Sequence, residues 1–135
     1  MGMGATNTLD RFSAFLGFVN GVETHFEGSM DVANAGVLLS VPALLCNGLF
    51  HDVNTYFQLP QGYYTLQQIF LLISFLALCR IKTYEQLRYT SPGEWGKLLG
   101  IDRIPEVKTL RKKISSQTCR DNDRRDWSGL AVTKL

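Results

Sequence analysis

The fold of this chain is indicated most clearly by residues 91–114, which read SPGEWGKLLGIDRIPEVKTLRKKI. Ser91 and Glu94 have the spacing of a capping box, in which each side chain bonds the backbone of the other. Pro92 suits the first position of a helix, where no N–H partner is needed. Gly100 suits the left-handed residue that ends a helix. The stretch therefore predicts a short helix over 92–99, a tight turn, and a second helix over 105–115.

The second helix is expected to have an apolar side and a cationic side. Val107, Leu110 and Ile114 follow the i, i+3, i+7 spacing of a buried helix face. A rotation of about 100° per residue places Lys108 and Lys112 nearly opposite that face. Such a helix suits a major groove lined by phosphates, so residues 92–114 are interpreted as a helix-turn-helix-like unit. The competing interpretation is a solvated charged face that binds nothing.

Charge is distributed unevenly along the 135 residues. Residues 1–79 have a net charge of −4 and residues 80–135 a net charge of +6, so an anionic partner is expected on the C-terminal half. The beginning of the chain lacks the pattern of a signal peptide, and the apolar run at 69–79 is too short to cross a bilayer. We therefore expect a cytoplasmic protein that does not enter the membrane. Three widely separated cysteines predict neither a zinc site nor a disulfide framework.

The remaining pattern is helical, and the predicted fold class is all-α, a small helical bundle. Helical spacing predicts helices over 10–19 and 35–50, and a buried helix begins near residue 65. Three domains or segments are expected: 1–34, an N-terminal helix and loop; 35–114, the helical domain; and 115–135, a polar linker with the start of a truncated helix at 127–135. Capping boxes are predicted at three pairs: Thr65 with Gln68, Thr83 with Gln86, and Ser91 with Glu94.

Three pieces of the chain carry a resemblance to a known family. They are GVLLSVPALL at 36–45, RIKTYEQLRY at 80–89, and PGEWGKLLG at 92–100 running into DRIPEVKTLR at 102–111. Together they resemble the N-terminal region of a family of bacterial DDE-type transposases. The resemblance implies a helical DNA-binding part that precedes an RNase H-like core. In that core three acids would hold two Mg²⁺ ions for phosphoryl transfer.

The catalytic core implied by the resemblance is absent from this sequence, so no catalytic residue and no metal ligand is assigned. No cofactor is expected in this chain, and the isolated chain is not expected to be an enzyme. The expected function is binding of transposon-end DNA. Two alternatives remain, a helical dimerisation module, suggested by the apolar stretches 69–79 and 127–135, and a transposase remnant without function.

The residues expected to contact double-stranded DNA lie on or near the second helix. Groove-facing positions and phosphate contacts are distinguished by their place on the helix face. Lys97 and Arg88 are expected to clamp the DNA backbone from the preceding helices. The complete set is Lys108, Thr109 and Lys112 facing the groove, Arg103, Arg111 and Lys113 on phosphates, and Lys97 and Arg88 as clamps. A homo-oligomer is the other partner expected.

Overall fold

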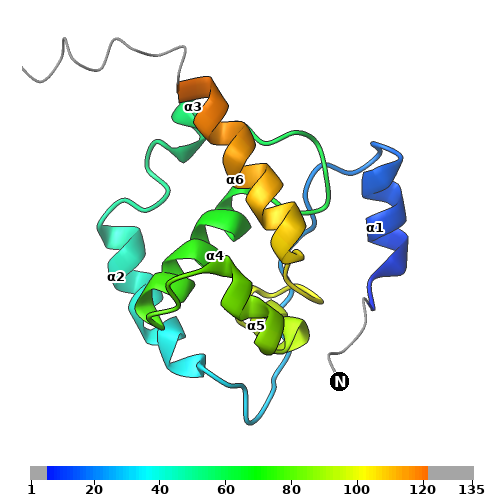
Figure 1. Ribbon diagram of the computed structural model, residues 1–135. Coiled ribbons are helices and arrows are strands. Elements are labelled where there is room, and N and C mark those ends of the chain that lie inside the picture. Colours follow the sequence, from blue (N-terminus) through cyan, green and yellow to red (C-terminus); the bar gives the residue numbers. More distant parts are fainter. Residues whose placement is uncertain (1–5, 122–135) are drawn as a thin grey trace, which may run out of the picture.

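The computed structural model describes residues 6–121, and this range contains helices and no strand (Figure 1). The all-α fold class predicted from the sequence is confirmed. The elements, in chain order, are α1 (Thr8–Phe15), the 3₁₀-helix η1 (Ala35–Ser40), α2 (Val41–Cys46), α3 (Val53–Tyr56), α4 (Leu66–Leu78), the 3₁₀-helix η2 (Tyr84–Tyr89), α5 (Pro92–Leu99) and α6 (Val107–Asp121).

Helix α4 forms the centre of the molecule. Its predicted capping box is present: Thr65 Oγ1 accepts from the backbone N–H of Gln68 at 3.2 Å, and Gln68 Oε1 accepts from the backbone N–H of Thr65 at 3.0 Å. Leu72 and Phe75 of this helix are fully buried. The apolar run at 69–79 is therefore largely core, and no helix within residues 6–121 has the length and apolar character that a membrane span requires.

Helices α5 and α6 complete the core around α4. Trp95, Leu98 and Leu99 of α5 are buried, and Leu110 of α6 is fully buried. Gly96 allows the chain after α5 to pass very close, because a Cβ there would lie 2.7 Å from the Ile101 carbonyl oxygen. The core is thus built from elements whose apolar faces were visible in the sequence.

The N-terminal segment is held to the bundle by backbone hydrogen bonds and by the ion pair between Arg11 and Asp102. The backbone N–H of Val22 donates to the Tyr63 carbonyl at 2.8 Å, and that of His25 donates to the Gly100 carbonyl at 2.7 Å. Figure 1 shows α1 at the side of the molecule, away from α2 and α3. Large apolar side chains in α1 and just after it are exposed, among them Phe15 and Phe18.

Two predicted helices are shorter in the structure. The helix expected over 10–19 spans Thr8–Phe15, and Gly17 follows it with a φ of 82°. The helix expected over 35–50 is a 3₁₀-helix followed by α2, which ends at Cys46 shortly before Gly48 takes a φ of 81°. Glycine adopts such positive φ values without steric cost, and so both glycines let the chain turn.

Two of the three predicted capping boxes are wrong. Ser91 and Thr83 make no side-chain cap hydrogen bond. Gln86 Oε1 instead accepts from the backbone N–H of Lys82 at 3.2 Å. Pro92 nevertheless occupies the start of α5, as predicted, and its fixed φ suits that position without a side-chain cap.

The segment 115–126, expected to be a polar linker or a frayed extension of the second helix, begins as part of α6, which continues to Asp121. The helix expected at 127–135 lies outside the described residues. The predicted division of the chain into 1–34, 35–114 and 115–135 stays a prediction.

Candidate nucleic-acid interface

Helix α6 has the two-sided character predicted from its sequence. Val107 and Leu110 are buried against the core and Ile114 is half-buried. Lys108, Thr109 and Lys112 are all exposed to solvent. No ion pair joins either lysine to another residue within the described part of the chain. The two ammonium groups are therefore available to an anionic partner.

A carboxylate on η2 links two of the predicted DNA-binding arginines. Glu85 Oε2 lies 2.9 Å from Arg88 Nε in an ion pair, and Glu85 Oε1 pairs with Arg111 of α6. All three side chains are largely exposed, at 43% for Glu85, 57% for Arg88 and 63% for Arg111. This cluster holds η2 against α6 and brings both guanidinium groups to the same side of the molecule. Because exposed ion pairs are weak, the arginines can exchange Glu85 for phosphate.

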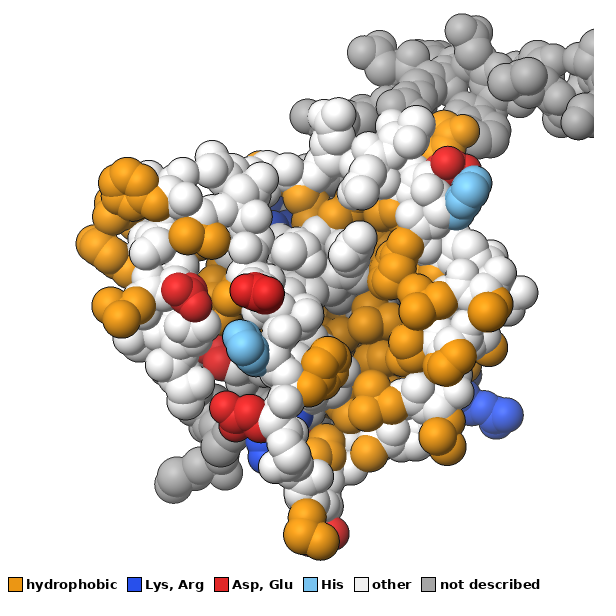
Figure 2. Space-filling view, turned by 180° about the vertical axis from the view of Figure 1, so that it is seen from behind, with side chains coloured by type: hydrophobic (Ala, Val, Ile, Leu, Met, Phe, Trp, Pro, Cys, Tyr) orange, Lys and Arg blue, Asp and Glu red, His pale blue; other side chains and the backbone are white. Residues whose placement is uncertain are grey.

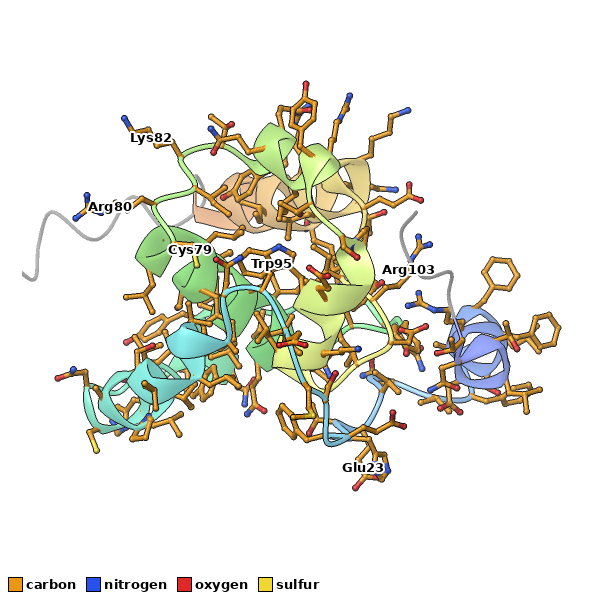
Figure 3. The ribbon with its side chains drawn as sticks, turned by 90° about the horizontal axis from the view of Figure 1, so that it is seen from below. Glu23, Cys79, Arg80, Lys82, Trp95 and Arg103 are labelled. Carbon is orange, nitrogen blue, oxygen red and sulfur yellow. The ribbon has the colours of Figure 1, made fainter. Side chains whose placement is uncertain are left out.

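Arg103 lies in the segment between α5 and α6, near the beginning of α6 (Figure 3). Its Nη2 donates to Glu106 Oε1 at 3.2 Å, and the side chain is 29% exposed. Its Nε is buried and has no hydrogen-bond partner within the described residues. Arg103 and Lys108 line one hollow of about 550 Å³, to which Arg88 also contributes.

Lys113 and Lys97 do not join this group. Lys113 is half-buried next to Gly62, and burial lowers its pKa below the ordinary lysine value. Lys97 is exposed, but its Nζ donates to Ser29 Oγ at 2.9 Å and it lines a different hollow. The structure thus brings together six of the eight predicted residues: Arg88, Arg103, Lys108, Thr109, Arg111 and Lys112.

The structure does not confirm a helix-turn-helix unit. The connection between α5 and α6 spans residues 100–106 and is not the tight turn that the sequence predicted. Ile101, Ile104 and Pro105 of this connection are buried, so packing in the core sets its length. Helix α6 packs on η2, whereas α5 packs on α4. The cationic surface is therefore shared by α6 and η2.

Two exposed cations that the site prediction omitted lie just before η2. Arg80 and Lys82 are exposed, and Figure 3 shows both side chains pointing away from the body of the molecule. They belong to the piece RIKTYEQLRY, so their proximity to Arg88 in sequence was the available signal. We refer to Arg80, Lys82, Arg88, Lys108, Arg111 and Lys112 as the basic face.

The opposite face of the molecule has a different character. Figure 2, which views the molecule from behind α6, shows a broad apolar area and more acidic than basic side chains. Exposed acids in the N-terminal half include Glu23, Glu27 and Asp52. The charge asymmetry of the sequence therefore has a counterpart in three dimensions.

A buried polar cluster that the sequence did not reveal joins α1 to the connection before α6. Arg11 donates from Nε to Asp102 Oδ2 at 2.9 Å and from Nη2 to Asp102 Oδ1 at 2.5 Å. Tyr63 donates to Asp102 Oδ1 at 2.9 Å, and Arg11 Nη1 contacts the Tyr64 hydroxyl at 3.2 Å. The Asp102 side chain is only 4% exposed. Arg11 and Asp102 are 91 positions apart, so no local pattern could have paired them.

The pKa shifts of the three groups in this cluster follow from the pairing of their charges and from their hydrogen bonds. Burial alone would raise the pKa of Asp102, but hydrogen bonds from Arg11 and Tyr63 outweigh burial and hold the pKa below the ordinary carboxyl value. Burial alone would lower the pKa of Arg11, but hydrogen bonds to Asp102 and Tyr64 raise it. Burial and the hydrogen bond to Asp102 raise the pKa of Tyr63. The cluster is a structural clamp, because its polar groups are satisfied by one another.

No three His, Cys, Asp or Glu side chains within residues 6–121 come together as metal ligands. No curated protein and no solved structure matches the chain. A family described as "Transposase protein" matches residues 2–133, which is nearly the whole sequence. The chain belongs to this transposase family.

Proposed function

We propose that this chain is a DNA-binding part of a transposase and that it binds transposon-end DNA through its basic face. The observation that carries the proposal is the pair Lys108 and Lys112, two exposed ammonium groups without ion-pair partners in the described chain. They lie one helical turn apart on α6, so they can contact neighbouring phosphates or the groove between them.

The rest of the basic face supports this assignment. Arg88 and Arg111 both pair with Glu85 near the lysines, and Arg80 and Lys82 extend the cationic surface beyond η2. The opposite face has an acidic and apolar character, so duplex DNA is attracted to one side of the molecule (Figure 2). A protein that moves DNA segments must hold their ends, which agrees with the transposase family.

Several finer expectations belong to this proposal. From the resemblance, we infer a bacterial DDE-type transposase that acts in the cytoplasm. Its catalytic acids and their Mg²⁺ ions would lie in a core that is not part of this sequence. The α6–η2 surface then serves to position DNA.

The test is duplex binding measured by fluorescence anisotropy, with competition between random DNA and the terminal repeats that flank the source gene. We expect a preference for the repeats, together with weaker binding by Lys112→Ala. The matched control is Lys97→Ala, which also removes one exposed lysine but lies in another hollow. Equal affinity for random and terminal DNA, or equal losses in the two variants, would contradict the proposal.

A second candidate function is a helical interaction module that associates with another copy of itself. The apolar helix that first suggested it, α4, is core, but α1 and the residues after it expose Leu9, Phe15 and Phe18 at 79%, 85% and 81%. Sedimentation of the wild type and of Phe15→Ser distinguishes the two candidates. Concentration-dependent association that Phe15→Ser abolishes would favour the module, and a monomer at high concentration would exclude it.

A further inference from the structure

We propose that the hollow between η2 and the beginnings of α5 and α6 is a binding site for a single phosphate group of the DNA backbone. The proposal rests on the proposed function and deepens it. The hollow has a volume of about 550 Å³ and is lined by Arg88 from η2, Arg103 from the connection before α6, and Lys108 from α6. Three cations from three parts of the chain thus surround one space.

The electrostatics of the hollow favour an anion. Glu106 is the acid among the lining residues, so the cations outnumber the acids there. Arg88 and Arg103 both carry guanidinium groups, whose paired N–H donors match the oxygens of a phosphate. Lys108 lies in the first turn of α6, where the helix dipole also favours negative charge.

Arg103 has donors that the protein leaves unused. The structure gives its guanidinium a hydrogen bond from Nη2 to Glu106, while Nε is buried and unpartnered within the described residues. Buried polar groups in folded proteins nearly always have a partner, and an orphaned one calls for an explanation such as an unfilled ligand site. An anion in the hollow would supply acceptor oxygens to the Nη groups of the guanidinium, whereas contact with the buried Nε would require the side chain to shift.

The position of the hollow makes a DNA backbone phosphate the fitting occupant. The hollow opens next to the basic face, because Arg88 and Lys108 belong to both. A phosphate seated there would lie at the N-terminal end of α6 and fix the position of that helix along the duplex. Phosphate contacts of this kind set register and orientation and read no bases. Arg103 would then anchor the DNA backbone at the beginning of α6, and Lys112 would lie farther along α6.

A second hollow among the described residues, of about 680 Å³, does not compete with this assignment. It is lined by Asp10, Glu23, Glu27 and Asp102 together with Lys97. Its acids outnumber its cations, and Asp102 is already bound by Arg11. A phosphate is therefore expected to bind in the hollow lined by Arg88, Arg103 and Lys108.

The first part of the test uses inorganic phosphate as the probe and ¹⁵N-labelled full chain as the protein. Amide shifts of Ile104, Val107 and Lys108 should change saturably with phosphate. Arg103→Gln should weaken this binding about tenfold, as the loss of a charge-assisted contact implies. Arg88→Gln, on the other side of the hollow, provides a second variant. Shifts spread over the surface, or equal titrations of wild type and both variants, would overturn the site.

The second part uses duplex DNA and separates this inference from the proposed function. Arg103→Gln should weaken binding to all duplexes evenly and lower the slope of log K against log salt by about 1 unit. If DNA binds normally to Arg103→Gln, the phosphate site is wrong while the proposed function stands. If neither the wild type nor Arg103→Gln binds DNA, both the phosphate site and the proposed function are wrong. Glu106→Gln is expected to tighten binding, because it removes the acid that competes for Arg103.

Discussion

Replacing Asp102 with asparagine should destabilise the fold by about 3 kcal/mol. The carboxylate accepts two hydrogen bonds from Arg11, one from Tyr63 and one from the backbone N–H of Arg103. Asparagine keeps the shape but loses the charge and replaces one acceptor oxygen by a donor. Removing one partner of a buried pair costs about 3–5 kcal/mol. The lower end applies because the Arg11 side chain is 22% exposed and can still reach water.

The cost should also depend on pH in a defined direction. Because the pKa of Asp102 is lower in the folded protein than in the unfolded chain, the carboxylate stabilises the fold above the ordinary carboxyl range. That contribution is lost as the pH falls through the folded pKa. The difference between wild type and Asp102→Asn should therefore be full at pH 7 and should shrink below about pH 4.

The assay is urea unfolding followed by circular dichroism at several pH values. Arg11→Met should cost a similar amount, and the double variant should cost less than the two single losses added together, because both remove the same ion pair. The matched control is Asp52→Asn, which changes an exposed acid. A loss under about 0.5 kcal/mol for Asp102→Asn, the range of ordinary surface changes, would refute the reasoning, as would a loss that does not vary with pH.

Three further predictions concern single side chains. Glu85→Gln should tighten DNA binding several-fold at low salt, because it frees two arginines from a weak exposed pair; anisotropy titrations that show weaker binding would contradict this. Gly96→Ala should lower the free energy of unfolding by about 1–3 kcal/mol, because the added Cβ would clash with the Ile101 carbonyl oxygen. Thermal unfolding measures the loss. Thr65→Ala should cost about 1 kcal/mol through its lost cap, while Thr83→Ala, whose hydroxyl caps nothing, should cost little; equal melting temperatures would refute the distinction.

The features that the sequence predicted correctly are local. The cap at Thr65, the glycine end of α5 at Gly100 and the buried face of α6 all depend on residues within one or two helical turns. Short spacings determine such features directly, and the apolar face of α6 in turn determines which lysines point to solvent.

The features that the sequence missed depend on distant contacts. The pair between Arg11 and Asp102 joins residues 91 positions apart. The length of the connection before α6 follows from burial of Ile101 and Ile104 in the core, which local turn rules do not describe. The proximity of Arg88 to Arg111 likewise required η2 to pack on α6. For the DNA-binding prediction, the sequence supplied six of the grouped residues, and the structure supplied their grouping and added Arg80 and Lys82.

The central claim is that Lys108 and Lys112 bind DNA phosphates or the groove between them. The most direct test is the slope of log K against log salt for a random duplex, compared between the wild type and the double variant Lys108→Ala/Lys112→Ala. Each lysine whose charge displaces a condensed counterion contributes about 0.9 unit to that slope, so the double variant should flatten it by about 2 units and bind more weakly. An unchanged slope with unchanged affinity would show that the exposed side of α6 is a solvated surface and would contradict the account.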